Sequence, residues 1–410
     1  MTVSRTQSTT ESHRAVAIVR NDAEAVGLAA DLAAEFAVDA AERELSRILP
    51  AVEMDVLSAS GLLAVTVPRE YGGADVSASS VAEVFRILAM ADPNIAEIMH
   101  SHFAYVNLLR LAANVRQREL LFAEILAGSR IASAQSERTN PAVSEIATTL
   151  WPVGSAGFIL SGTKCLCSGA VFADRIAVLA RLDDPNQVAG LAEGEHVAYL
   201  PASTPGLSVD DDWDTLGQRL TASGTVRLDH VQVPAESVVP RRAAFQQPYS
   251  CAAYSQLLHA AIDTGIARSA LAEAARFVNA QRRDSARTDD DPLLTQRFGE
   301  LEVDVSAAES MLHTAAERVD LALDKPWEQT ASDASIAVAT AKILGERTAL
   351  DAGSALFEVA GERSASAELN LSRHWRNVRT HTLHDPIRWK YHHIGRHTLS
   401  GIAPPRQGVI

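Results

Sequence analysis

Apolar residues recur at intervals of three or four over the first third of the chain, which is the spacing of one buried face of an α-helix. Asn21 or Asp22 can cap the first of these helices, and another is expected after Pro50. The same spacing resumes over 80–90, 95–112 and 115–126. The pattern predicts an N-terminal α-helical domain over 21–130, preceded by a disordered tail over 1–20.

The pattern changes near Arg130 to short runs rich in β-branched residues, separated by Gly and Pro. Strands are expected over 158–160, 176–179, 197–200 and 224–233. Short strands with frequent turns are typical of a small antiparallel barrel or sandwich. We therefore expect a central β domain over 131–242.

Helical spacing returns after the β domain and continues towards the C-terminus. The expected helices cover 257–281, 293–323, 332–359 and 369–382. Long helices with short connections favour an antiparallel bundle, and Ala-rich stretches let helices approach closely. The predicted fold class is α+β, with a C-terminal helical bundle and tail over 243–410.

Composition excludes several classes of protein. The 410 residues carry a net charge of −14, with 47% hydrophobic and 21% charged residues, which excludes a disordered chain. The acidic balance disfavours binding to nucleic acid or to an anionic membrane. The three cysteines cannot form a disulfide framework, the polar N-terminus has no signal-peptide core, and no apolar run is long enough to span a membrane. We expect a soluble cytoplasmic protein.

Histidines are concentrated near the C-terminus, where six of the 13 lie between His374 and His397. His381 and His384 are three positions apart, so on a helical turn they share a face and can exchange protons near neutral pH. A solvated helix end is the alternative reading. A metal site is disfavoured, because a His pair with only Asp385 nearby seldom suffices.

A second group of candidates, His100 and His102, lies in the apolar segment IMHSHFAYVN, where a histidine is usually a satisfied core residue, so the pattern alone favours a structural role. In KCLCSGA, Cys165 and Cys167 alternate as on a strand and are expected to be inert thiols, with Ser168 beside a glycine. The motifs of dinucleotide-binding Rossmann domains, P-loops and serine hydrolases are missing from the sequence.

Five segments in order resemble the acyl-CoA dehydrogenase superfamily over nearly the whole chain. They are GLLAVTVPREYGGADVS, SAQSERTN, LSGTKCLCSGAVFAD, LGQRLTASGTVRLDHVQVP and GERSASAELNLSRHWRNVRT. SHFAYVNLLRL, QLLHAAIDTGIARSAL and RHWRNVRTHTLHDPIRWKYHHIG further resemble bacterial sulfur-acquisition oxidoreductases and, more distantly, dibenzothiophene-type flavin-dependent monooxygenases. The resemblance implies a helical domain, a small β-barrel and a helical bundle, assembled as a homotetramer.

A dehydrogenase of this superfamily needs a carboxylate base in one of two places. Here those places read Thr380 to His384 and Tyr254 to Gln256, without a carboxylate, and Asp263 and Asp385 lie nearby but not at these positions. The resemblance therefore implies a two-component monooxygenase that acts on a small organosulfur compound. It would use reduced FMN, with FAD possible, supplied by a separate NAD(P)H:flavin reductase. An N-oxygenase, an aromatic hydroxylase, an acyl-CoA dehydrogenase with an atypical base and a non-catalytic flavoprotein stay open.

The resemblance also implies roles for individual residues. The catalytic set would be His102, Ser168, His381 and His384, whose neutral donors suit a site that must exclude water. The isoalloxazine ring would contact Gln135, Ser136, Cys167 and Ser168. The flavin phosphate would be reached by Arg282 of a neighbouring subunit, with Arg376 and Asn377 as further cofactor contacts, although an exposed Arg is often only solvated. Tyr105, one helical turn from His102, and Trp213, near the substrate entrance, would contact the substrate, with packing of the β domain as the alternative for Trp213. No metal is expected.

Overall fold

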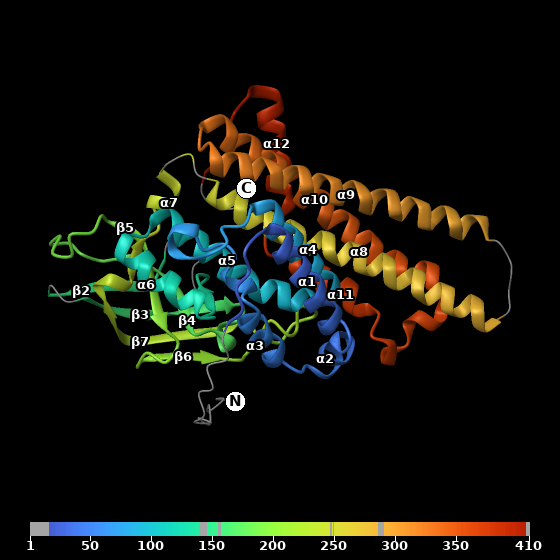
Figure 1. Cartoon of the computed structure of the whole chain (residues 1–410), viewed down its shortest axis with the longest axis horizontal. Helices are drawn as coiled ribbons and strands as arrows, with labels where there is room; N and C mark the ends of the chain where they lie inside the picture. The colour runs from blue at the N-terminus through green and yellow to red at the C-terminus, as the bar shows by residue number, and fades with distance from the viewer. Residues whose placement is uncertain are drawn as a thin grey trace.

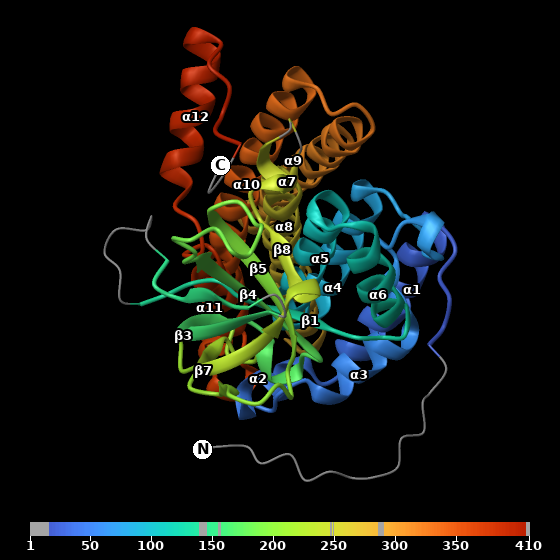
Figure 2. The ribbon, with the colours of Figure 1, turned by 90° about the vertical axis from the view of Figure 1, so that its left-hand side faces the viewer.

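A computed structural model describes residues 16–138, 146–154, 157–246, 248, 250–285 and 291–406. Its element order confirms the predicted α+β class: helices, then a sheet, then a long helical bundle (Figure 1). The sheet lies at one end of the molecule and the bundle extends from it, with the N-terminal helices packed against both (Figures 1 and 2).

The N-terminal helices begin at the caps that the sequence supplies. The Asn21 side chain accepts from the Glu24 N–H, and Asp92 caps the helix that Pro93 opens. The helices are α1 (Asp22–Phe36), α2 (Ala40–Ser46), α3 (Ala51–Ser60), α4 (Ala78–Ala91), α5 (Pro93–Ala112) and α6 (Val115–Leu126), with 3₁₀ turns η1 (Leu62–Ala64) and η2 (Arg69–Tyr71).

The predicted disordered tail is wrong for its last five residues. The Ala17 N–H donates to the Ala59 carbonyl over 2.9 Å, and Val19 packs against the core. Val16 and Val19 are partly buried, whereas Ile18 is 76% exposed, so two apolar side chains and the backbone hydrogen bond offset the entropy of ordering the segment. Residues 1–15 of the expected tail lie outside the described residues.

The central strands form a mixed sheet in the order β6-β7-β3-β2-β4-β5-β8, with β1 paired to β4. The expectation of a purely antiparallel arrangement is wrong, because β1 and β2 both pair with β4 in parallel. The strands are β1 (Ile131–Ala134), β2 (Thr149–Val153), β3 (Gly157–Cys167), β4 (Arg175–Leu182), β5 (Gly194–Pro201), β6 (Leu207–Asp210), β7 (Gly224–Pro234) and β8 (Val238–Pro240), with 3₁₀ turns η3 (Ala170–Phe172) and η4 (Ala235–Ser237).

The bundle is built on long helices whose small residues allow close contact. A side chain at Gly345 would lie 3.1 Å from Thr264 Oγ1, so this glycine brings α10 close to α8. The elements are α7 (Ala243–Gln246), α8 (Cys251–Ser285), α9 (Pro292–Asp324), α10 (Glu328–Ala360), α11 (Ser372–His381) and α12 (Ile387–Ser400), with 3₁₀ turns η5 (Glu362–Ala365) and η6 (Ala367–Leu369).

The prediction of a final helix over 369–382 is wrong in extent. Asn370 adopts a left-handed conformation, so α11 begins only at Ser372. Pro386 then precedes a further helix, α12, which projects from the body of the molecule (Figure 2). Within α12 only Lys390 is buried. The turn between α11 and α12 carries His384.

Helix α5 lies between the sheet and the bundle, and this position determines what its side chains contact. The Tyr199 hydroxyl of β5 donates to the Tyr105 carbonyl on one side of α5. On the other side, Ile95 and Met99 share a core with Leu257 and Ala260 of α8. No helix in the described part of the chain is long and apolar enough to cross a membrane.

Candidate active site

Among the described residues, four histidines from three parts of the chain lie together, with three of them around the fourth. His259 on α8 is at the centre, with its ring centroid 3.8 Å from that of His100 on α5. The centroids of His384 and His381 lie 4.2 Å and 5.1 Å from that of His259. We call these four residues the histidine cluster. His100, His259 and His381 are buried, whereas 52% of the His384 side chain is exposed.

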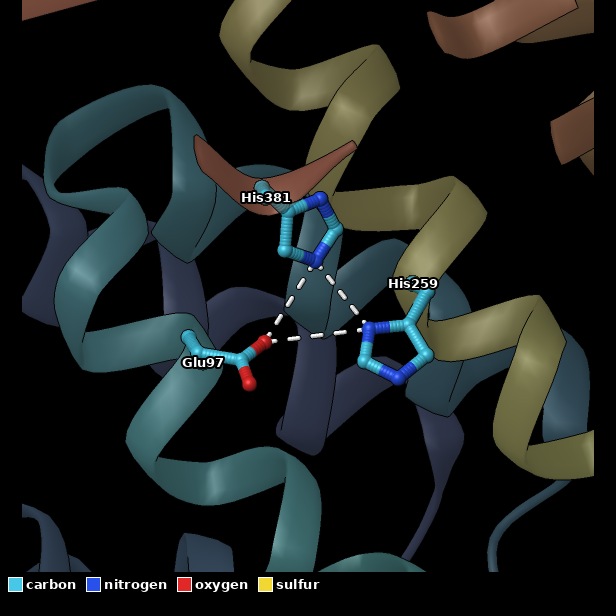
Figure 3. Close-up of side chains that lie close together, drawn as sticks. All are labelled: Glu97, His259 and His381. Carbon is cyan, nitrogen blue, oxygen red and sulfur yellow. Dashed lines mark hydrogen bonds and ion pairs between the residues drawn. The ribbon is translucent and has the colours of Figure 1, made fainter. Parts of the chain in front are cut away.

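Two carboxylates hold His381 in place. Its Nδ1–H donates to Asp263 Oδ1 over 2.6 Å, while Glu97 Oε2 lies 3.4 Å from its Nε2 (Figure 3). Burial disfavours the charged imidazole, but the Asp263 carboxylate outweighs this and raises the pKa of His381 to about 9. His381 is therefore a buried imidazolium at neutral pH.

His259 has the opposite electrostatic character. Burial, and then the positive charge of its imidazole neighbours, holds its pKa well below the usual value. Its Nδ1 lies 3.0 Å from Nε2 of His381, which gives a hydrogen bond from the protonated ring to the neutral one. Nε2 of His259 is buried and has no hydrogen-bond partner among the described residues. The cluster thus places a proton donor beside a neutral relay with one open position.

Further buried charged groups of the bundle lie next to the histidine cluster. The second oxygen of Asp263 forms an ion pair with Lys342 of α10, and both side chains are almost completely buried. Asp385, in the turn that carries His384, accepts from the Gln256 amide of α8. Burial raises the pKa of Glu346 to about 6 and lowers that of Lys390 to about 8. Charged groups at this depth rigidify the helices only while they stay paired.

A stripe along α5 connects the cluster to the sheet. Glu97, Ser101 and Tyr105 are spaced by four and share one helix face. The Ser101 hydroxyl lies 2.9 Å from that of Ser133 on β1, and the Tyr105 hydroxyl donates to Gln135 Oε1 over 3.1 Å. Burial raises the pKa of Tyr105 to about 12, so it stays a donor. The structure thus brings the predicted residues Tyr105 and Gln135 into contact.

The two segments expected to meet the flavin ring lie side by side. The Ser136 carbonyl accepts from the Cys165 N–H over 2.9 Å, which joins the end of β1 to β3. Cys167 is fully buried, and burial raises its pKa to about 12, so it is a neutral thiol. Ser168 is half-buried, and its hydroxyl lies 2.7 Å from that of Ser223. Gln135 and Ser136 are exposed, so this edge is open to a ligand.

A buried ion pair holds the backbone of the Gln135–Ser136 segment in place. Lys164 Nζ donates to Glu137 over 2.6 Å and to the Gln135 carbonyl over 3.1 Å. Burial opposes ionisation of Glu137, but the bond from Lys164 outweighs it and lowers the pKa of Glu137 to about 2. The sequence did not single out Lys164.

His102 faces away from the histidine cluster. The Ile131 N–H donates to its Nδ1 over 3.1 Å, so its Nε2–H donates to the Leu63 carbonyl over 2.8 Å. Burial lowers the pKa of His102 to about 4, which keeps the ring neutral. With both nitrogens bonded to backbone, His102 joins α5 to η1 and β1, and the structure places His100 in the cluster instead.

Arg376, Asn377 and Trp213 lie together at a separate junction between α11, α2 and the segment before β7. Arg376 makes a two-pronged ion pair with the buried Glu44. Asn377 Oδ1 accepts from the Gln218 N–H over 2.8 Å, and Trp213 Nε1 donates to the Gln218 carbonyl over 2.8 Å. These polar groups all have partners within the chain, so all three residues help to hold this junction together.

Arg282 and Arg283 are exposed near the end of α8. Along the helix they are roughly 35 Å beyond His259. Within one chain they are therefore remote from the histidine cluster.

Three domain families match the chain in order: the acyl-CoA dehydrogenase N-terminal domain over residues 24–129, the middle domain over 124–231 and the C-terminal domain over 257–389. Dibenzothiophene monooxygenase of Rhodococcus qingshengii is 31% identical, over 93% of this chain and 95% of that protein. The chain belongs to the acyl-CoA dehydrogenase superfamily. Flavin-dependent monooxygenases are among the relatives that it matches over the full length.

Two further relatives are associated with FMN. The probable FMNH2-dependent monooxygenase SfnC of Pseudomonas putida is 30% identical, over 93% of this chain and 96% of that protein. The FMN-bound structure of TdsC from Paenibacillus sp. A11-2 has 30% identity and a TM-score of 0.86, over 93% of this chain and 99% of that one. Both similarities extend over nearly the full length of this chain and of the relative.

Membership of the superfamily raises the question of whether a carboxylate lies where a dehydrogenase keeps its base. The two places where a dehydrogenase base is expected hold Thr380 to His384 and Tyr254 to Gln256. Asp263 lies close by but is bound to Lys342 and His381. Glu97 was not singled out from the sequence, although a carboxylate three positions before His100 on an apolar helix was a usable signal.

Proposed function

We propose that this chain is an FMNH2-dependent monooxygenase that oxygenates a small organosulfur compound. The observation that carries the proposal is the histidine cluster, which takes the place of a free carboxylate base. A buried imidazolium next to neutral imidazoles can deliver protons without adding a negative charge. The full-length likeness to dibenzothiophene monooxygenase supports both the oxygenase chemistry and the sulfur substrate.

The residues at the edge of the sheet suit a flavin. The edge of an isoalloxazine ring offers hydrogen-bond donors and acceptors in one plane. The exposed Gln135–Ser136 segment and the Ser168 hydroxyl present matching groups without a net charge. Gln135, Ser136, Cys167 and Ser168 would hold the ring. Reduced FMN, when bound, supplies the electrons for oxygen activation.

The side chains of this chain then have separate tasks. Asp263 holds the proton on Nδ1 of His381, and His381 Nε2–H points at His259. His259 can accept that proton on Nδ1 while releasing one from Nε2, which is how a neutral imidazole relays protons. The burial of His100 and His259 limits access of water. His384, half-exposed at the surface, is the member that a substrate would meet first.

A separate NAD(P)H:flavin reductase follows from this proposal, because electrons must reach FMN before it binds. The homotetramer also stays a proposal, with Arg282 of a neighbouring subunit near the flavin phosphate. The Ala-rich part of α10 is occupied within the chain, since Ala334 and Ala341 are fully buried. Helix α12, which projects from the body of the molecule, would offer a clearer surface for assembly (Figure 2).

The test mixes the protein with chemically reduced FMN under nitrogen and then adds ¹⁸O2 and a panel of sulfides, sulfoxides, sulfones and sulfinates. We expect one labelled oxygen in a sulfur product. Amines and phenols in the same panel test the N-oxygenase and hydroxylase alternatives. Acyl-CoA substrates with an artificial electron acceptor test residual dehydrogenase activity. Release of hydrogen peroxide alone across the whole panel contradicts the monooxygenase proposal.

A further inference from the structure

We propose that Glu97, His259 and His381 form a binding site for a divalent transition-metal ion of the zinc type. Nδ1 of His259, Nε2 of His381 and Oε2 of Glu97 face one another (Figure 3). The two nitrogens are 3.0 Å apart, and the carboxylate oxygen lies 3.4 Å from His381 and 3.7 Å from His259. Tetrahedral zinc with bonds of about 2.0–2.1 Å holds neighbouring ligand atoms about 3.3 Å apart. The three atoms already have this spacing.

The carboxylate of Asp263 prepares His381 to act as a ligand. It accepts the Nδ1–H of His381 over 2.6 Å, so Nε2 is the atom turned towards the other two ligands. A carboxylate bound to the far nitrogen of a histidine is the usual support of a zinc ligand, because it fixes the ring and raises its basicity. Lys342 in turn neutralises Asp263 and holds it in place.

The other two ligand atoms are buried. His259 Nδ1 accepts the proton on Nε2 of His381, so binding of the ion displaces this proton, which is released to solvent. Glu97 Oε2 is buried and accepts no hydrogen bond among the described residues. His259 is 1% exposed, and its ring packs against those of His100 and His384 at centroid distances of 3.8 Å and 4.2 Å. Its orientation therefore costs little further entropy when an ion binds.

The donor set selects the class of ion. Two imidazole nitrogens and one carboxylate oxygen suit Zn²⁺ and its transition-metal neighbours, whereas Mg²⁺ and Ca²⁺ prefer oxygen ligands. Three protein ligands leave a fourth position for water or a small anion. Each ligand comes from a different helix, namely α5, α8 and α11, so an ion would also join the two helical parts of the fold.

This site goes beyond the proposed oxygenase function and opposes it. His259 and His381 cannot relay protons while their inward nitrogens bind a metal. Zn²⁺ would therefore inhibit oxygenation reversibly, and a chelator would restore it. The binding itself requires neither flavin nor turnover, so it can be tested even if the substrate proposal fails.

The experiment is a calorimetric titration of the full-length, flavin-free protein with Zn²⁺. We expect one ion per chain and no saturable binding of Mg²⁺. Glu97→Gln, which keeps the size of the side chain, and His259→Gln should each weaken Zn²⁺ binding at least tenfold. The matched control is His313→Gln on α9, because the His313 side chain is 72% exposed and lies outside the cluster. This variant should bind Zn²⁺ like the original protein.

Two results would overturn the proposal. One is the lack of a saturable site at one ion per chain. The other is unchanged affinity in both Glu97→Gln and His259→Gln, which would assign the ion to exposed histidines such as His392 on α12. If a variant fails to fold, the visible spectrum of Co²⁺ bound to the original protein decides. Bands of tetrahedral intensity support the site, and a spectrum of hydrated Co²⁺ contradicts it.

Discussion

Nδ1 of His381 lies 2.6 Å from Oδ1 of Asp263, in a region between α8 and α11 where both side chains are almost completely buried. The other oxygen of Asp263 pairs with Lys342 of α10. One carboxylate therefore balances two positive groups and connects three helices of the bundle. This relationship holds the proton on Nδ1 of His381 and links α8, α10 and α11 through buried charges.

Replacing Asp263 by Asn should destabilise the protein strongly. The change leaves Lys342 buried without its counter-charge, and breaking one side of such a pair costs about 3–5 kcal/mol. Urea unfolding followed by circular dichroism measures the loss. Asp55→Asn is the control, because Asp55 is 74% exposed in its ion pair with Arg130 and should cost less than about 1 kcal/mol. Equal losses in the two variants would contradict a buried role for Asp263.

The stability of the fold should depend on pH through His381. Its pKa rises from 6.5 to about 9 on folding, so protonation favours the native state. The stabilisation is complete below about pH 6.5 and is lost as the pH rises through 9, by on the order of 3 kcal/mol.

Comparison with His381→Gln isolates the contribution of His381 to the pH dependence of stability. Lys390, whose pKa burial lowers to about 8, titrates in both proteins and cancels from the difference. The difference in unfolding free energy between the two proteins should therefore shrink between pH 6.5 and 9.5. Parallel stability curves over this range would exclude His381 as the titrating group.

His102→Asn should lower stability without changing the chemistry. The shorter side chain cannot bond both the Ile131 N–H and the Leu63 carbonyl, and a buried group left unsatisfied costs about 1–3 kcal/mol. Product formed per folded enzyme should stay within about twofold. His259→Gln is the comparison, with product formation reduced at least tenfold. A large catalytic defect in His102→Asn would return this residue to the catalytic set.

His384→Ala should uncouple oxygen use from product formation. Because half of the side chain is exposed, its loss should change the melting temperature little. We expect FMN affinity within about twofold of the original and a several-fold rise in hydrogen peroxide released per oxygen consumed. An electrode for oxygen and a peroxidase assay measure the two quantities. His392→Ala, an exposed change on α12, should leave coupling as it was, and the same coupling in both variants removes His384 from the site.

The sequence alone determined the order of the parts and the class of the fold. Helical spacing places α5, α9 and α10 close to their observed bounds, because an amphipathic helix must repeat its apolar residues about every 3.6 positions. The superfamily segments indicated the oxygenase relatives through the missing carboxylate at Thr380 to His384. The pair His381 and His384 was also visible, since three positions on a helical turn are neighbours.

Only the tertiary structure decided which other side chains join that pair. His100 and His102 differ by two positions, so they point to different sides of α5, and the packing of that helix selects His100. His259 lies on an apolar helix whose pattern is that of any core helix, and it acquires a role only because α5 and α11 approach it there. Periodicity shows which face of a helix is buried. It carries no information about which other segment supplies the partner, because that depends on contacts between residues far apart in the chain.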